Sequence, residues 1–316
     1  MRHTNVLVLG GSGFIGRYVV NLLVARGISV VVPSRRRDRA KHLIVLPTCD
    51  VVEADIMDDA TLDRLVAGAD AVINLVGILH GTERALQQVH ADLPRRVVAA
   101  CTKHRVSRLI QMSAIGASAS APSMYLRSRA AGEGHVRKTS LAWTIFRPSV
   151  VFGIEDRFLN LFGWLSFWFF LLPIGGAAAK FQPVWVEDVA RAIANSLDNE
   201  ATFGKVYELA GPRIYTLREL VTFAAQAAGH PRPVLALPDT LARLQARVME
   251  LLPGPTLLSR DNLDSMKIDS VASKQPFVPA PELGIGITPM EPEAAFYLAG
   301  KHPRTRFGGM RTRARR

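Results

Sequence analysis

Short apolar runs alternate with amphipathic stretches over the first 150 residues of the chain. The apolar runs predict buried strands at Asn5–Leu9, Ser29–Pro33, Val51–Ala54, Ala71–Leu75, Arg108–Ser113 and Trp143–Arg147. Helical spacing of apolar residues predicts helices between them at Phe14–Arg26, Thr61–Ala67, Arg84–Lys103 and Ser123–Lys138. Because continuous apolar strands separated by helices are typical of a sheet covered on both faces, we expect an α/β fold with a doubly wound parallel sheet of six strands.

After Pro148 the alternation loosens into a smaller C-terminal αβ region, which we expect to contact the substrate. Its predicted elements are strands at 184–186 and 205–209 and helices at 187–197, 217–228 and 240–252. Beyond Pro253, proline and glycine punctuate the chain and indicate loop. We therefore expect a sheet domain at 1–150, a substrate or membrane-contact region at 151–270 interleaved with it, and a loop-rich basic tail at 271–316.

One segment of the smaller region is unusually apolar. The 22 residues at 158–179 carry no charge and hold five Phe and two Trp. A single membrane crossing is disfavoured, because both flanks belong to the same folded region and Pro173, Gly175 and Gly176 limit the helix to about fifteen residues. Three alternatives stay open: an interfacial element at headgroup depth, a buried core helix, or the wall of an apolar pocket.

The charge of the chain is uneven. Seven of its net +12 charges come from the last sixteen residues, which contain no acid. Such a tail suits anionic lipid headgroups or an acidic protein partner, although a simply solvated tail fits as well. No helix-turn-helix, aromatic RNA-binding or zinc-finger pattern accompanies it, so we expect no nucleic-acid partner.

The two cysteines, Cys49 and Cys101, show no metal-ligand spacing and no disulfide framework. The first residues enter a strand without an apolar signal region. We expect no bound metal and a cytoplasmic location, with peripheral attachment to the inner face of the membrane as a further expectation.

A glycine-rich turn, GGSGFIG, follows the first strand and opens the first helix. The first glycine permits the tight turn, Gly13 lets the backbone approach a pyrophosphate, and Gly16 lets the helix pack closely. The helix N-terminus then offers free N–H groups to the phosphates. We therefore expect a Rossmann domain whose cofactor contacts include Gly10, Gly11, Ser12, Gly13, Phe14, Ile15 and Gly16.

The end of the second strand indicates which dinucleotide is bound. An NAD site usually has a carboxylate about 20 residues past the glycines, to accept from the ribose hydroxyls. Here the sequence is Ser34-Arg35-Arg36-Arg37, and guanidinium groups pair with a 2′-phosphate. We predict NADP(H), bound by Arg35 and Ser34. Further contacts are expected at the ends of the third and fourth strands, from Asp55, Ile56, Val76 and Gly77.

Candidate chemistry follows the fifth strand. Ser113 ends this strand, and Tyr125 and Arg129 share one face of the next helix because they are four residues apart. The serine would hold a substrate carbonyl, and the tyrosine would transfer the proton beside the cation. His80 is a weaker candidate for the nicotinamide pocket, and we expect His90 and His104 on helix surfaces.

The glycine turn, Asp55-Ile56, Ser113 and Tyr125 together resemble the short-chain dehydrogenase/reductase superfamily, in its extended or atypical, epimerase/dehydratase-like branch. The segments RPSVVFG, QPVWVEDV, YELAG and LSRDNL further resemble the nucleotide-binding accessory subunit family of respiratory complex I and its bacterial relatives. Arg129 stands where the superfamily's YxxxK motif has lysine. The resemblance implies that NADPH is bound as a structural part of the protein, as in the complex I relatives.

Two functions are therefore expected. The first is an NADPH-dependent reductase acting on a small apolar substrate, such as a quinone or isoprenoid, near the membrane. The second is a non-catalytic subunit or assembly factor that holds NADPH and docks on a respiratory membrane complex. A nucleic-acid-responsive sensor has only the net charge in its favour.

Overall fold

The computed structural model describes residues 3–254 and 256–300. Their chain folds into two compact units, each made of three separate segments. Of the described residues, the sheet unit comprises those at 3–148, 186–209 and 272–286, and the second unit comprises those at 149–185, 210–271 and 287–300. The chain therefore passes between the units several times, and neither unit is a single stretch of sequence.

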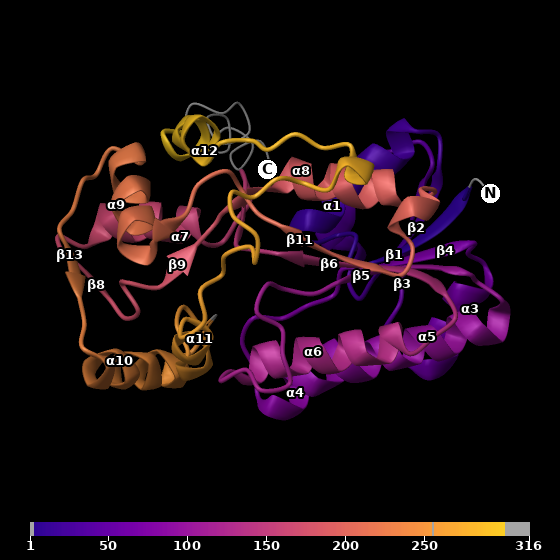
Figure 1. Ribbon diagram of the computed structural model, residues 1–316, viewed down its shortest axis with the longest axis horizontal. Helices are drawn as coiled ribbons and strands as arrows, with labels where there is room; N and C mark the ends of the chain where they lie inside the picture. The colour runs from indigo at the N-terminus through magenta and orange to yellow at the C-terminus, as the bar shows by residue number, and fades with distance from the viewer. Residues whose placement is uncertain (1–2, 255, 301–316) are drawn as a thin grey trace. The chain divides into compact units, whose positions relative to one another are not determined.

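The sheet unit is built on seven parallel strands in the order β11-β6-β5-β4-β1-β2-β3 (Figure 1). The strands are β1 Asn5–Leu9, β2 Ser29–Ser34, β3 Cys49–Glu53, β4 Ala71–Asn74, β5 Arg108–Met112, β6 Ala142–Pro148 and β11 Lys205–Leu209. The doubly wound fold is confirmed. The predicted number of strands was wrong by one, because the strand at 205–209, assigned to the smaller region, pairs with β6 and extends the main sheet.

Helices cover both faces of this sheet. Figure 1 shows α1 (Phe14–Ala25) and α8 (Val186–Ser196) on one face, with α3 (Asp59–Ala67), α5 (Leu93–His104) and α6 (Met124–Arg137) on the other. The short helices α2 (Lys41–Ile44) and α4 (Glu83–Gln87) complete the unit, with the turns η1 Arg37–Ala40, η3 Glu200–Thr202 and η4 Pro281–Leu283. Side-chain caps define helix starts in this unit, as where Asp58 accepts from the N–H of Thr61 and Ser123 accepts from the N–H of Leu126.

The helix predicted at 84–103 is interrupted in its middle. The turn η2 (Gln88–Asp92) has π-helical hydrogen bonding and separates α4 from α5. Single π-helical turns inside α-helices are frequent at functional sites. This turn packs against α6, which carries the predicted catalytic residues.

Arg108 is fully buried at the start of β5. Its guanidinium donates to the backbone carbonyls of Ala142 and Ser196, at 2.6 Å each, and to the Thr144 hydroxyl at 2.9 Å. Its Nε donates to the carbonyl of Leu197 at 2.9 Å. Burial lowers the pKa of Arg108 to about 9. One cation thus ties β5 and β6 to the last residues of α8, where carbonyls lack helical partners.

The second unit contains short strands and four longer helices among its described residues. Its elements are β7 Val151–Phe152, α7 Leu159–Trp168, β8 Leu172–Ile174, β9 Lys180–Phe181, β10 Val184–Trp185, β12 Tyr215–Thr216, α9 Leu217–Ala227, β13 Val234–Ala236, α10 Asp239–Leu251, α11 Arg260–Ser265 and α12 Met290–Leu298. The helices α11 and α12 both lie beyond Pro253, in the stretch expected to be loop. The basic residues of the tail, at 301–316, lie outside the described residues.

The apolar segment at 158–179 divides its side chains between two environments. Leu159 is buried, and Phe158, Phe162 and Leu165 pack against a buried cluster of the same unit. The opposite side of α7 and the residues after it are exposed, at Trp164, Phe167, Trp168, Phe169, Phe170 and Leu171. The helical part is ten residues long, shorter than expected. Among residues 3–254 and 256–300, no helix is long and apolar enough to cross a membrane.

Candidate functional site

The glycine turn links β1 to α1 at the point where the strand order reverses. Gly10 has φ +78°, a conformation that glycine adopts without strain, and a Cβ there would meet the main chain of Leu75 at 3.1 Å. A Cβ on Gly16 would lie 2.3 Å from the Gly10 carbonyl oxygen and 2.6 Å from the Gly11 Cα. The turn therefore lies against the end of β4, and only glycine at position 16 lets α1 start this close to it.

The N-terminus of α1 has the chemistry to bind a ligand. Gly13 occupies the position before the helix and has no side chain with which to cap the first N–H groups. The helix runs for twelve residues, so its N-terminal N–H groups and dipole favour an anion. Among the described residues, a Cβ on Gly13 would have one close neighbour, the Gly10 carbonyl oxygen at 3.1 Å. A side chain at position 13 would therefore be tight against the Gly10 carbonyl but would meet fewer atoms than one at position 16.

The end of β2 presents the arginines. Ser34 is buried, and its hydroxyl donates to the carbonyl oxygen of Arg36 at 2.9 Å. This bond closes a turn that leaves Arg35, Arg36 and Arg37 exposed. We expected the Ser34 hydroxyl to donate its proton to a phosphate. The hydroxyl instead donates to the Arg36 carbonyl and stabilises the turn, while its oxygen can still accept a hydrogen bond. Asp38, just beyond, is exposed and pairs with Lys41 at 3.0 Å.

The residues predicted beside the adenosine lie at the ends of β3 and β4. Asp55 is exposed and accepts from the N–H of Met57 at 3.0 Å, which forms a local turn. Ile56 is half-buried and packs against the main core cluster. The N–H of Val76 donates to the side chain of Asn74 at 3.2 Å. These positions follow the carboxyl ends of β3 and β4, which lie on either side of β1 and β2 in the parallel sheet, and ligands of doubly wound sheets bind at the carboxyl ends of the strands.

The structure brings Ser113, Tyr125 and Arg129 to the same edge of the sheet. The Arg129 guanidinium carbon lies 5.3 Å from the centre of the Tyr125 ring. Its Nη1 donates to the carbonyl oxygen of Met112, which precedes Ser113, at 3.1 Å, and to that of Val76 at 3.4 Å. The buried cation therefore joins the ends of β4 and β5 to α6, although lysine was the residue that the superfamily motif led us to expect.

Two buried polar atoms of this edge have no hydrogen-bond partner among the described residues. They are the hydroxyl oxygen of Ser113, which is 3% exposed, and the Nε of Arg129, which is 8% exposed. Leaving such groups unpaired costs about 1–3 kcal/mol each, so a ligand that pairs with them stabilises the site. Together with the glycine turn, they fit the ribose and nicotinamide half of a dinucleotide.

Three polar residues that shape this edge were not predicted as site residues. The buried side chains of Asn74 and Gln111 bond to each other at 3.0 Å between β4 and β5. The sequence feature that could have indicated this pair is the glutamine within the otherwise apolar run of β5. The expectation for His90 was wrong: this residue is 1% exposed and bonds to Ser128, because the π-helical turn directs it inward. Nothing in the helical spacing indicated such a turn.

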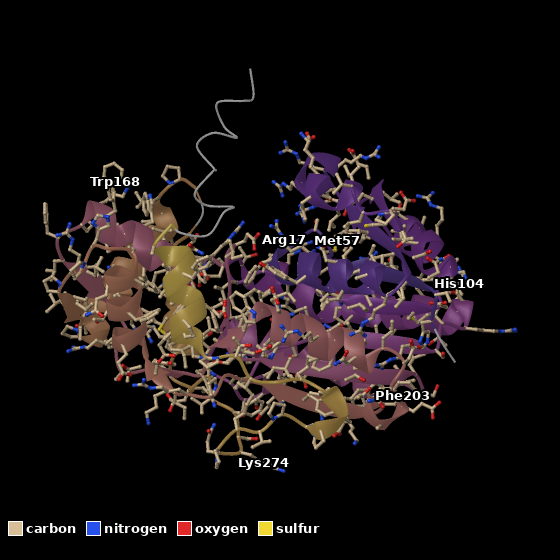
Figure 2. All side chains as sticks on the ribbon, turned by 90° about the horizontal axis from the view of Figure 1, so that it is seen from above. Arg17, Met57, His104, Trp168, Phe203 and Lys274 are labelled. Atoms are coloured by element: carbon tan, nitrogen blue, oxygen red, sulfur yellow. The ribbon has the colours of Figure 1, made fainter. Side chains whose placement is uncertain are left out.

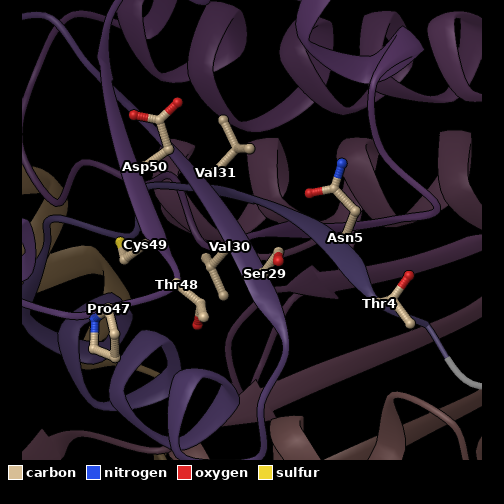
Figure 3. Close-up of a pocket in the computed structure, with 9 residues that line it drawn as sticks. All are labelled: Thr4, Asn5, Ser29, Val30, Val31, Pro47, Thr48, Cys49 and Asp50. Carbon is tan, nitrogen blue, oxygen red and sulfur yellow. The ribbon is translucent and has the colours of Figure 1, made fainter.

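A shallow hollow of about 710 Å³ lies at the amino ends of the strands, opposite the glycine turn (Figure 3). Asn5, Ser29 and Cys49, which start three neighbouring strands, are among the residues that line it. Ligands of doubly wound sheets bind outside the carboxyl ends of the strands. We therefore do not assign the hollow to the dinucleotide.

Comparison with known proteins supports the nucleotide site. A family described as NAD(P)H-binding matches residues 10–155. The fold matches the crystal structure of Thermus thermophilus UDP-glucose 4-epimerase in complex with NAD, with a TM-score of 0.64 and 20% identity over 84% of this chain and 99% of that one. The family match shows a domain of the NAD(P)H-binding kind, and the structural likeness shows the fold. The choice of NADP(H) over NAD(H) stays a prediction.

The chain is also similar in sequence to named proteins, among them the following two. NADH dehydrogenase (ubiquinone) 1 alpha subcomplex subunit 9, mitochondrial, of Arabidopsis thaliana is 34% identical over 284 residues, which cover 84% of this chain and 70% of that protein. Ceramide reductase of Caulobacter vibrioides is 29% identical over 238 residues, which cover 74% of each chain.

Proposed function

We propose that this chain, which belongs to the family of NADH dehydrogenase (ubiquinone) 1 alpha subcomplex subunit 9, holds NADP(H) as a fixed part of its structure and docks on a respiratory membrane complex. The anchoring of Arg129 is the observation that carries the proposal. The family relationship supports the membrane complex as the partner, and the glycine turn supports the dinucleotide.

Arg129 is suited to binding the cofactor and poorly suited to relaying a proton. One of its terminal nitrogens donates to the carbonyls of Val76 and Met112, and the other lies 2.1 Å from where a Cβ on Gly77 would be. Guanidinium groups do not release a proton in proteins. The cation is therefore fixed between two strand ends, and its remaining Nε is available to the oxygens of a bound ribose.

A second candidate function is the reduction of an apolar carbonyl or quinone substrate by NADPH. The unpaired hydroxyl of Ser113 favours it, because a buried hydroxyl at this position can donate to a substrate oxygen. Tyr125, against the Arg129 cation, would supply the proton. The relationship to a ceramide reductase supports an apolar substrate. Bound NADPH would supply the hydride.

Mass spectrometry of the purified chain distinguishes the two functions. We expect NADP(H) to remain bound through gel filtration in about one copy per chain. With a short-chain ubiquinone analogue or a long-chain ketone, we expect NADPH oxidation no faster than the background. Turnover that Ser113→Ala and Tyr125→Phe each lower by about 100-fold would instead establish the reductase, since general acids contribute on that order. A chain without nucleotide affinity contradicts both functions.

Arg35 is expected to select the phosphorylated cofactor. Removing its charge with Arg35→Ala should weaken NADPH binding by about 10- to 100-fold, because a charge-assisted bond to the 2′-phosphate is lost. The affinity for NADH should change less than twofold. Arg39→Ala, at an exposed arginine of the following turn, is the matched control. Calorimetric titration of both cofactors measures the ratio, and an unchanged NADPH-to-NADH preference in Arg35→Ala would contradict the assignment.

The exposed apolar residues of the second unit support contact with a membrane surface. Figure 2 shows Trp168 at the outside of the molecule, where it is 62% exposed, and Phe170 is 80% exposed with the Arg232 guanidinium over its ring. On α10, a stripe of large apolar residues is also exposed: Leu241, Leu244, Val248 and Leu251. The helix packs inward by Ala242 and Ala246. Aromatic residues with adjacent arginine are typical of lipid interfaces.

Vesicle flotation tests this contact. We expect the chain to float with anionic phosphatidylglycerol vesicles and the double variant Trp168→Ser/Phe170→Ser to lose at least tenfold in partitioning, because each buried side chain contributes roughly 1.5–3 kcal/mol. Val45→Ser is the control, since Val45 is also 80% exposed but belongs to the sheet unit. Equal flotation of the double variant and the control would exclude the aromatic segment as the lipid contact.

A further inference from the structure

His90 lies at the centre of the contact between η2 and α6, inside the sheet unit. The residue is 1% exposed, and it belongs to the π-helical turn that separates α4 from α5. A Cβ on Gly132 of α6 would come within 1.9 Å of the His90 carbonyl oxygen. The absence of a side chain at position 132 therefore lets α6 pass directly over this turn.

The imidazole has a polar partner on each side. Its Nε2 accepts from the backbone N–H of Ile78 at 3.1 Å, in the loop at residues 75–80 that follows β4. Its Nδ1 then carries the proton and donates to the Ser128 hydroxyl at 2.9 Å. The Ser128 hydroxyl in turn donates to the carbonyl oxygen of Tyr125 at 2.8 Å. This chain of bonds ties the loop after β4 to the first turn of α6.

The ring is also packed against the predicted proton donor. The centres of the His90 and Tyr125 rings lie 5.4 Å apart, with the ring planes at 85°, an edge-to-face arrangement. Burial and, to a lesser degree, the Arg129 cation lower the pKa of His90 to about 2. The imidazole is therefore neutral at physiological pH, and its arrangement of one donor and one acceptor is fixed.

The same loop carries Val76 and Gly77, which contact Arg129. One side of the loop is thus held by Arg129 and the other by His90, and both Tyr125 and Arg129 belong to the helix that His90 contacts. A dinucleotide bound at the glycine turn spans the ends of the central strands, with its 2′-phosphate end toward β2 and its nicotinamide end toward β5. The contacts of His90 with Ser128 and Tyr125, on α6, lie on the nicotinamide side.

We propose that His90 is a positioning residue, which sets the loop after β4 and the Tyr125–Arg129 face of α6 at the spacing required by the nicotinamide half of the cofactor. The proposal rests on the proposed function, since it assumes that NADP(H) occupies this edge of the sheet. It assigns a role to a side chain that does not itself touch the reacting atoms.

The test separates the two halves of the ligand. Calorimetric titrations of the full chain with NADPH and with 2′,5′-ADP compare binding that involves the nicotinamide half with binding that does not. His90→Phe keeps a ring against Tyr125 but removes both polar contacts. We expect it to weaken NADPH binding at least tenfold, because the Ile78 N–H loses its acceptor and the Ser128 hydroxyl loses its donor, and to leave the affinity for 2′,5′-ADP within twofold of wild type. Ser128→Ala removes the bonds of its hydroxyl to His90 and to the Tyr125 carbonyl but keeps the bond between Ile78 and His90, so it should give a smaller loss with the same selectivity.

Equal weakening of both ligands in His90→Phe and Ser128→Ala would overturn the proposal, because it would indicate general damage to the fold. Unchanged NADPH affinity in either folded variant would also overturn it. If His90→Phe does not fold, Ser128→Ala decides between these outcomes. A wild-type chain that binds neither ligand would refute the proposed function itself, and a wild-type chain that binds 2′,5′-ADP as tightly as NADPH would refute only the role of His90.

Discussion

Replacing Gly16 with alanine is expected to abolish NADP(H) binding. The added methyl group would lie 2.3 Å from the Gly10 carbonyl oxygen and 2.6 Å from the Gly11 Cα, and neither is the movable end of a side chain. The glycine turn must therefore open or α1 must shift, and either change displaces the N–H groups offered to the phosphates. We expect the affinity for NADPH to fall by at least 100-fold, as measured by calorimetry, together with a loss of thermal stability of several degrees.

Gly134→Ala provides a matched control for this variant. Gly134 also lies within a helix, α6, but a Cβ there meets no atom of the described residues within 4 Å. Alanine is favoured over glycine inside helices by about 0.8–1.0 kcal/mol, so this variant should be slightly more stable than wild type and bind NADPH normally. NADPH affinity of Gly16→Ala within twofold of that of Gly134→Ala would refute the close packing that the glycine turn implies.

Arg108→Met is expected to cause the largest loss of stability. Methionine fills most of the volume of arginine but removes the donor from four backbone carbonyls and the Thr144 hydroxyl. Buried acceptors that lose their partners cost about 1–3 kcal/mol each, and breaking a buried charged network costs about 3–5 kcal/mol in total. We therefore expect the free energy of unfolding in urea to drop by about 4 kcal/mol.

Two further variants define what Arg108 contributes. Arg108→Lys retains a positive charge, but an ammonium has three donors and a narrower reach, so we expect it to recover less than half of the loss. Arg95→Met makes the same change at an exposed arginine of α5 and should alter stability by less than about 0.5 kcal/mol. If Arg108→Met unfolds at the same urea concentration as Arg95→Met, the buried network does not stabilise the fold.

The strands, the glycine turn and the face shared by Tyr125 and Arg129 could be predicted because each depends on residues close together in sequence. The predicted β1 has the observed bounds, since the apolar run at Asn5–Leu9 is fully local. The glycine turn after β1 could be predicted for the same reason, because its glycines and the start of α1 are adjacent in sequence. The resemblance to the family also rests on short motifs of this local kind.

Features that depend on distant partners could not be predicted in the same way. The strand β11 has an ordinary apolar pattern, and only its pairing with β6 places it in the main sheet. His90 sits in a helical stretch whose spacing indicates nothing unusual, and its burial follows from the π-helical turn and the passage of α6 over it. The exposed stripe of α10 could not be predicted either, because it depends on Ala242 and Ala246 being the side of this helix that packs against the rest of the unit.

The late position of β11 has a consequence for synthesis of the chain. When β6 leaves the ribosome, its outer edge still lacks the partner that completes the sheet, and β11 is made about sixty residues later. At roughly 5–20 residues per second, that edge is unpaired for about 3–12 seconds. An uncovered strand edge pairs readily with other chains. During this interval the nascent protein is exposed to aggregation, and fragments cut near residue 150 should share this weakness permanently.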